Sequence, residues 1–189
     1  MIETLKVKLQ SYAPETQSNL RATLIPASVI VLITYASPTY KILLNKRTNN
    51  VQDHKGEMSF PGGRKDNSDV NLQSTALREF EEEMGISPDN IDIIGRLSDV
   101  ATSTNYLITP YVATTNSKLN LSPNPKEVES IIEIPIHELS KHENVRTEVR
   151  VNNLKPNKYS CYAYQGKFIW GATARILTEL LTMIELELH

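Results

Sequence analysis

Cysteine is nearly absent from this sequence, because its 189 residues include only Cys161. A single cysteine cannot form an internal disulfide, which indicates a reducing compartment. Long apolar segments are lacking as well. The beginning of the chain, "MIETLKVKLQSYAPETQ", has no hydrophobic core of signal-peptide length, and no later stretch could span a bilayer. We therefore expect a cytoplasmic protein that has no membrane partner.

An excess of positive charge is also missing. The sequence has 20 Lys and Arg against 22 Asp and Glu, a formal net charge of −2. This balance gives neither a basic field for tracking nucleic acid nor a polybasic membrane contact. We therefore expect no nucleic-acid partner, whereas a nucleotide ligand is compatible and a homodimer stays open. The length and the 40% hydrophobic content suit a single domain over residues 1–189.

Hydrophobic periodicity predicts a mixture of strands and helices. The expected helices are a peripheral N-terminal one within residues 1–20, then 71–84, a short one at 137–141, and 172–186. The expected strands are 28–35 and 41–47, paired as a hairpin, followed by 91–100, 106–115, 129–136, 147–153, 159–165 and 167–171. Because strands and helices do not alternate steadily, the pattern favours an α/β fold with a mixed sheet and helices on its faces.

The helix expected at 71–84 is unusually acidic. At about 100° per residue, Glu79, Glu82 and Glu83 share one side of it, whereas Glu81 points away. Like charges three and four residues apart destabilise a helix by roughly 0.2–0.5 kcal/mol per pair. A divalent cation among the carboxylates would remove that penalty, and carboxylate oxygens suit Mg²⁺ or Mn²⁺. The alternative is a solvent-facing acidic helix without a function.

Glycine is scarce and unevenly placed. Of seven glycines, four fall within one segment: Gly56, Gly62, Gly63 and Gly85. Gly62 and Gly63, in a predicted Pro–Gly–Gly turn, would let the backbone approach a ligand closely and offer carbonyl oxygens to an ion. A glycine pair directly before an acidic helix therefore favours the metal-site interpretation over the solvent-facing one.

At this point the residues resemble a known family. The segment "REFEEEMGI", residues 78–86, is similar to the core of the Nudix box, and each fixed position of that core is met. The box as a whole would run from about residue 63 to 86. Upstream it departs from the general pattern, because Asp69 stands where glutamate is usual and the interval to Arg78 is one residue longer.

A second segment resembles a particular subfamily. "LLNKRTNNVQDHKGEMSFPGG", residues 43–63, is similar to the motif that precedes the box in the coenzyme A pyrophosphatases of the Nudix superfamily. Asn45, Thr48 and Gln52 replace the usual threonine, serine and arginine. "STNYLITPYV" and "FIWGATARIL" also look like this subfamily, so the resemblance extends from about residue 22 to 180.

The resemblance implies an α/β/α sandwich with a mixed sheet and a metal-dependent hydrolase of nucleoside diphosphate linkages. It implies Glu79 and Glu83 as direct ligands of Mg²⁺ or Mn²⁺, with Glu82 as a third or water-mediated ligand. A carbonyl of the Gly62–Gly63 pair could join them. Arg78 is expected to orient the glutamates by ion pairing.

The remaining candidate residues lie outside the acidic helix. The general base is expected to be Glu127 or Glu129, with Glu127 slightly ahead, and a surface pair beside Lys126 is the alternative. Arg47 is a candidate phosphate contact because a guanidinium binds phosphate bidentately, although a strand-end ion pair would explain it equally well.

Three single residues receive a structural interpretation. His54 lacks a second ligand at metal spacing, Cys161 is expected to be a packed thiol, and Trp170 a core anchor or a base-stacking surface.

Three functions remain in view. The first is hydrolysis of coenzyme A or its derivatives to 3′,5′-ADP and a 4′-phosphopantetheine fragment. The second is the same chemistry on another nucleotide, such as ADP-ribose, a dinucleotide or a nucleoside triphosphate. The third is a Nudix-fold binding regulator that has lost catalysis.

Overall fold

The computed structural model describes residues 1–20, 23–48, 56–115, 119–152 and 155–185. Its helices are α1 (Ile2–Ser11), α2 (Leu72–Met84), α3 (Ile136–Leu139) and α4 (Gly171–Glu185), with short 3₁₀ turns at Ser18–Leu20, Pro88–Asn90 and His142–Asn144. The strands are β1 (Ile25–Ala36), β2 (Thr39–Arg47), β3 (Met58–Ser59), β4 (Gly62–Arg64), β5 (Asp92–Arg96), β6 (Val100–Ala101), β7 (Tyr106–Thr114), β8 (Val128–Pro135), β9 (Val145–Asn152), β10 (Lys155–Tyr164) and β11 (Lys167–Ile169).

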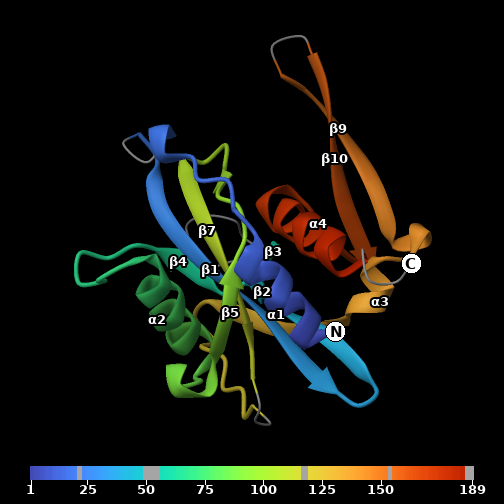
Figure 1. Cartoon of the computed structure of the whole chain (residues 1–189). Coiled ribbons are helices and arrows are strands. Elements are labelled where there is room, and N and C mark those ends of the chain that lie inside the picture. Colours follow the sequence, from blue (N-terminus) through green and yellow to red (C-terminus); the bar gives the residue numbers. More distant parts are fainter. Residues whose placement is uncertain (21–22, 49–55, 116–118, 153–154, 186–189) are drawn as a thin grey trace.

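Eight of these strands form one mixed sheet. Its path runs β3-β2-β1-β7-β5, and β4, β6 and β8 pair with β1, β7 and β2. β1 and β7 are parallel, whereas the other pairs in this sheet are antiparallel. The remaining three strands, β9, β10 and β11, make a separate antiparallel sheet. The β9–β10 hairpin projects away from the body of the molecule (Figure 1).

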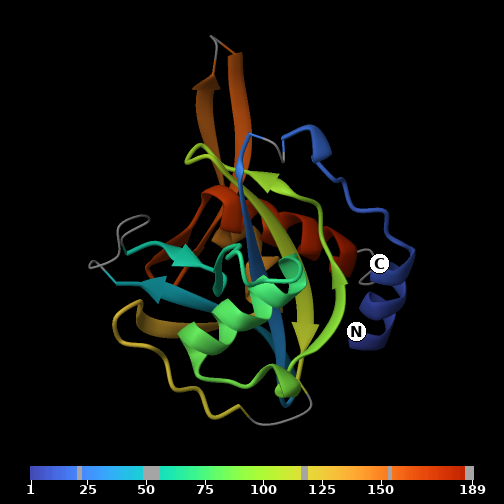
Figure 2. The same cartoon turned by 90° about the vertical axis from the view of Figure 1, so that its left-hand side faces the viewer.

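The central strand β1 is buried on both faces, which defines the layers. Ile30 and Leu32 pack in a cluster with Phe80 of α2, whereas Val31 and Ile33 pack in another cluster with residues of α1 and α4. Successive residues of a strand point to opposite faces, so α2 covers one face and α1 and α4 cover the other. Figure 2 shows α2 in front of the sheet and α4 behind it. The expected α/β/α arrangement is confirmed.

The N-terminal helix packs closely on the sheet. Leu5 and Leu9 of α1 are 1% and 5% exposed and belong to the cluster that includes α4. Lys8 Nζ donates to the carbonyl of Met183 over 2.8 Å. No helix in the described ranges has the length and apolarity needed to cross a membrane.

One local expectation is wrong. The glycine pair was expected in a turn, but Gly62 and Gly63 lie in β4, opposite Val29 and Ser28 of β1. Gly62 has φ +152°, and a Cβ there would overlap the Ser28 carbonyl oxygen. A side chain is therefore excluded by the close approach of two strands, which a sequence pattern read as a turn does not reveal.

We predict that Phe80→Ala will destabilise the protein by about 3–5 kcal/mol, the usual range for a large aromatic removed from a core. Phe80 has none of its surface exposed and joins α2 to the sheet. Urea unfolding measures the change. Val70→Ala is the matched control because Val70 is 89% exposed; equal effects of the two substitutions would contradict the packing of α2 on β1.

Candidate active site

Helix α2 brings its acidic side to β4, which contains Gly62 and Gly63 and is called the glycine strand below. Asn71 caps its N-terminus by accepting a bond from the Ser74 backbone N–H over 2.8 Å, and Gly85 ends it in the left-handed region at φ +69°. Ala76, Phe80 and Met84 are fully buried against the sheet. This burial fixes the rotation of the helix, so the adjoining side, with Glu79 and Glu83, faces β4.

The glycine strand and the two carboxylates touch. The backbone N–H of Gly62 donates to Glu83 Oε2 over 3.2 Å. A Cβ at Gly63 would overlap the carboxyl group of Glu79. Gly63 therefore leaves the space in which the Glu79 carboxylate rests, while Gly62 binds Glu83 through its N–H, so β4 and α2 are in direct contact.

Glu83 is the most enclosed member of the site, with 1% of its side chain exposed. Its Oε2 also accepts from Asn45 Nδ2 over 2.9 Å, and its Oε1 accepts from Arg47 NH1 over 3.3 Å. Burial raises the pKa of Glu83 to about 8, and the charges of Glu127 and Glu79 add to the rise. The Arg47 charge and the Gly62 N–H oppose it without cancelling it.

Glu79 and Glu82 share Arg78. The Arg78 NH1 donates to Glu79 Oε1 over 2.9 Å and to Glu82 Oε2 over 3.1 Å. The Glu79 side chain is 16% exposed, and burial raises its pKa although Arg78 opposes the change. The Glu82 side chain is 54% exposed and lies at the rim. The structure therefore brings Glu79 and Glu83 to β4 and leaves Glu82 closer to solvent.

Arg78 is itself held by Asp69, a residue to which the sequence assigned no role in the site. Nε and NH2 of Arg78 donate to the two carboxylate oxygens of Asp69 over 3.0 and 2.9 Å. Bonds from Arg78 hold the pKa of Asp69 far below its usual range. Asp69 is 8% exposed and also accepts from Thr75 Oγ1. The signal in the sequence was that Asp69 stands where the motif usually has glutamate, with one extra residue before Arg78.

The two candidate bases have different surroundings. Glu129 is 43% exposed and bound by Lys46 Nζ over 2.6 Å, on the surface. Glu127 lies close enough to Glu79 and Glu83 for its charge to raise the pKa of each. Its Oε1 accepts from Asn124 Nδ2 over 3.2 Å. Of the two, only Glu127 adjoins the carboxylates of α2.

The donor set suits a divalent cation, although the described residues hold no ready cluster. Among them, no group of three or more His, Cys, Asp or Glu side chains is arranged to hold a metal ion. Glu79 and Glu83 are instead engaged by Arg78 and Arg47. They are nonetheless buried carboxylates that repel one another and Glu127. Hard oxygen ligands under mutual repulsion fit Mg²⁺ or Mn²⁺.

Arg47 lies between the carboxylates and a cleft. Its NH1 holds Glu83, while its Nε is buried and has no hydrogen-bond partner. Buried guanidinium N–H groups without partners are rare in folded proteins. Arg47, Gly62 and Gly63 all line the same cavity, and 23% of the Arg47 side chain is exposed, so its guanidinium group is placed to meet an anionic ligand there.

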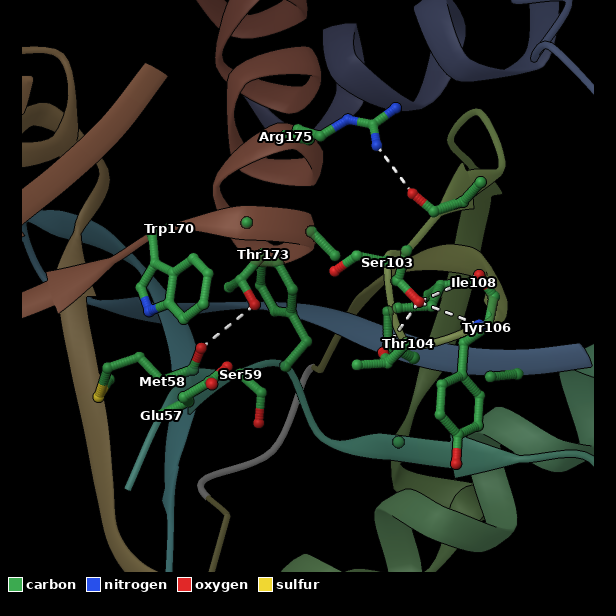
Figure 3. Close-up of a pocket in the computed structure, with 18 of the residues that line it drawn as sticks. Glu57, Met58, Ser59, Ser103, Thr104, Tyr106, Ile108, Trp170, Thr173 and Arg175 are labelled. Carbon is green, nitrogen blue, oxygen red and sulfur yellow. Dashed lines mark hydrogen bonds between the residues drawn. The ribbon is translucent and has the colours of Figure 1, made fainter. Parts of the chain in front are cut away.

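The cavity has a volume of about 840 Å³ and lies between the main sheet, α4 and the small sheet. Trp170 and Tyr106 approach it from opposite sides (Figure 3). Thr173 donates to the Met58 carbonyl over 3.2 Å, and Arg175 donates to the Ala101 carbonyl over 3.0 Å. Trp170 thus lies at a cavity wall, where its ring could stack on a base bound in the cavity.

Two other single residues complete the comparison with the sequence. Cys161 is buried and its Sγ lies 3.6 Å from Glu148 Oε2, as expected of a packed thiol. His54 and Gln52 lie outside the described residues.

The molecule is thus an α/β/α sandwich in which two carboxylates of a helix contact a glycine strand beside a cleft. The chain belongs to the Nudix family, since the model of the Nudix domain matches residues 24–152. It is 33% identical over 163 residues to the uncharacterized Nudix hydrolase NudL of Yersinia pestis strain Pestoides F, covering 85% of this chain and 79% of that protein. NudL of Yersinia pseudotuberculosis serotype O:1b is equally similar. The chain is a Nudix diphosphohydrolase.

Solved structures share the fold. A MutT/nudix family protein from Enterococcus faecalis gives a TM-score of 0.58 at 16% identity, covering 100% of this chain and 70% of that one. An Ap4A hydrolase of C. elegans, in a binary complex, gives 0.52 at 15% identity, over 59% and 80% of the two chains. The Nudix domain of Shewanella oneidensis NrtR, complexed with ADP ribose, gives 0.50 at 23% identity, over 69% and 82%.

We predict that Gly63→Ala will destabilise the protein, because the new methyl group would overlap the Glu79 carboxyl group. Overpacking typically costs about 1–3 kcal/mol, and we expect the low end of this range because the Glu79 carboxyl group is the end of a flexible side chain that can shift. Thermal unfolding measures the change. The double variant Gly63→Ala, Glu79→Ala should recover most of the loss, and no recovery would show that the clash lies elsewhere.

A second prediction concerns pH. Because the folded state holds a proton on Glu83 up to a pKa of about 8, against an ordinary value of 4.5, it binds more protons than the unfolded state between these values. The metal-free protein should therefore lose stability as pH rises through this window. Each kcal/mol lost lowers Tm by about 2–4 °C.

The measurement is Tm in EDTA from pH 5 to 8 for the wild type and for Glu83→Gln. The variant lacks the titrating group, so its curve should fall less steeply. Parallel curves would contradict the proposed protonation of Glu83.

Proposed function

We propose that the protein hydrolyses the diphosphate bond of coenzyme A or its derivatives, giving 3′,5′-ADP and 4′-phosphopantetheine or its acyl form. The observation that carries this proposal is the meeting of Glu79 and Glu83 with the Gly62–Gly63 strand at the wall of a cleft that Arg47 also lines. The single cysteine suits work in the cytoplasm as a single-domain enzyme.

In this proposal Glu79 and Glu83 hold Mg²⁺ or Mn²⁺, with Glu82 as a third ligand or a ligand through water. When bound, the ion neutralises phosphate oxygens and lowers the pKa of its water. Support comes from the buried carboxylates, whose repulsion a cation would relieve. The backbone N–H of Gly62 bonds to Glu83, so the Gly62–Gly63 strand lies beside these carboxylates, and in this proposal one of its carbonyl oxygens is a further ligand.

The chain's own residues then have separate tasks. Glu127 accepts the proton of the attacking water, for which its place near Glu79 and Glu83 is the support. Arg47, whose side chain is 23% exposed and lines the cleft, donates to a phosphate oxygen of the substrate. Arg78, which donates two hydrogen bonds to Asp69, orients Glu79 and does not need to touch the substrate.

The composition of the cleft supports coenzyme A as the substrate. Three arginines, Arg47, Arg64 and Arg175, are among its lining residues, against two glutamates, Glu57 and Glu148. Coenzyme A carries a 3′-phosphate beyond its diphosphate, so it offers an anionic group that ADP-ribose lacks. The volume of about 840 Å³ is within the range of ligand pockets. Trp170 offers a flat surface for the adenine base.

The second candidate keeps the chemistry and changes the nucleotide. It is favoured by two proteins of the same fold, one described as an Ap4A hydrolase and one complexed with ADP ribose. The third candidate, a regulator without catalysis, is disfavoured because Glu79, Glu82 and Glu83 are all present.

We predict that product analysis with coenzyme A will yield 3′,5′-ADP in Mg²⁺ or Mn²⁺, and that kcat/KM will exceed that for ADP-ribose. Glu83→Gln should reduce turnover by about 100-fold or more, as expected when a ligand of the metal that activates water is lost. Lys41→Gln, a change on the distant hairpin, should keep wild-type turnover. Faster hydrolysis of ADP-ribose would favour the second candidate.

Unchanged turnover in Glu83→Gln would place the chemistry elsewhere. If the wild type turns over neither substrate nor any other diphosphate, the regulator is the better explanation.

A further inference from the structure

Asn45 is a buried polar residue whose amide makes two side-chain hydrogen bonds, one to Glu83 and one to Ser59. It lies in β2 with 0% of its surface exposed. Its Nδ2 donates to Glu83 Oε2 over 2.9 Å, and its Oδ1 accepts from Ser59 Oγ over 2.5 Å. Both ends of the amide are therefore used, one on Glu83 and one on the neighbouring strand.

The orientation of this amide is determined by its partners. In the ionised form that binds a cation the Glu83 carboxylate can only accept, so the NH₂ end must face Glu83, and the Ser59 hydroxyl can donate to the carbonyl end. Asn45 and Ser59 are opposite residues in the pairing of β2 with β3, which places their side chains on the same face. The pairing of β2 with β3 thus sets the position of Ser59. Ser59 in turn sets the orientation of the Asn45 amide, and that amide sets the orientation of the Glu83 carboxyl group.

The two oxygens of Glu83 are consequently unequal. Oε2 accepts two hydrogen bonds, from Asn45 and from the Gly62 N–H, and a carboxylate oxygen has about two lone-pair sites. Among the described residues, Oε1 accepts a single hydrogen bond, from Arg47 NH1 over 3.3 Å. Hydrogen bonds from the protein use both lone-pair sites of Oε2, whereas Oε1 keeps a lone pair that could coordinate a cation.

We propose that Asn45, anchored by Ser59, is a positioning residue that holds Glu83 by Oε2 and so presents Oε1 to the divalent cation. This inference rests on the proposed function, because it presumes that Glu83 is a metal ligand. An amide is suited to the task because it adds no positive charge beside the ion. Residues that orient metal ligands in this way commonly affect metal affinity by about 10–100-fold when replaced.

The test is metal binding to the full-length protein without substrate. Free Mn²⁺ is followed by electron paramagnetic resonance during a titration of the wild type, Asn45→Leu, Ser59→Ala and Tyr162→Phe. Leucine has nearly the shape of asparagine but no donor, so the Mn²⁺ Kd of Asn45→Leu should rise about 10–100-fold. Ser59→Ala should raise it by a smaller factor, because the amide loses its anchor.

Tyr162→Phe is the matched control. Tyr162 is 4% exposed, and its hydroxyl lies 2.8 Å from Thr178 Oγ1, in the packing of β10 on α4. This variant also loses a buried hydrogen bond, but its Mn²⁺ Kd should equal that of the wild type. Tm in EDTA reports the effect of each substitution on the fold alone.

Kinetics add a second measurement. Since Asn45 is not placed against the substrate, Asn45→Leu should lower kcat for coenzyme A with KM within about twofold at saturating Mn²⁺, a split that indicates loss of an interaction made in the transition state. Below saturation the loss should be larger, and raising Mn²⁺ should remove the part that reflects weaker metal binding. A lower Tm with an unchanged Mn²⁺ Kd and kcat would show a purely structural role and overturn the inference.

Two further outcomes are decisive. If Asn45→Leu does not fold, Ser59→Ala, at a partly exposed position, decides alone, and a Kd within twofold of the wild type overturns the inference. If the wild type neither binds Mn²⁺ nor hydrolyses a diphosphate, the proposed function fails first, and the inference falls with it. Binding by the wild type with no change in either variant rejects only the role of Asn45.

Discussion

The close approach of α2 to β4 is the constraint on which the rest of the site depends. Glu83 accepts a bond from the Gly62 backbone, and the carboxyl group of Glu79 fills the space a Cβ of Gly63 would need. Carboxylates packed this tightly in a buried place repel one another, and burial disfavours their charge. The fold therefore maintains an acidic contact that is unfavourable by itself, held in place by the apolar side of α2 on β1.

Several surrounding residues offset this unfavourable contact. Arg78 binds Glu79 and Glu82 on one side, and Asp69 holds Arg78 by a two-point ion pair. Arg47 binds Glu83 on the other side. The arginines neutralise part of the charge while leaving the carboxylates on the glycine strand. Their geometry makes the site a defined arrangement before any ion or substrate is present.

The sequence predicted the parts that depend on local patterns. The periodicity of Ala76, Phe80 and Met84 and the stop at Gly85 were sufficient for α2, and the acidic side followed from the same periodicity. Sequence reasoning could not place Gly62 in a strand, because the reason is an approach to Ser28, which is distant in the chain. The bonds of Asp69 to Arg78 and of Asn45 to Glu83 likewise depend on tertiary contact. The sequence left Trp170 as either a core anchor or a base-stacking surface, because its place at the cavity wall depends on how α4 and the small sheet pack.

The separate sheet has a consequence for how this molecule can diversify. β9 and β10 contribute Glu148 and Tyr159 to the outer wall of the cleft, whereas the carboxylates and the glycine strand belong to the main sheet and α2. The two walls share no backbone hydrogen-bond ladder among the described strands. The hairpin side of the cleft can therefore change, and with it the shape of ligand that the cleft accepts, without altering the glycine strand on the other side or the carboxylates that contact that strand.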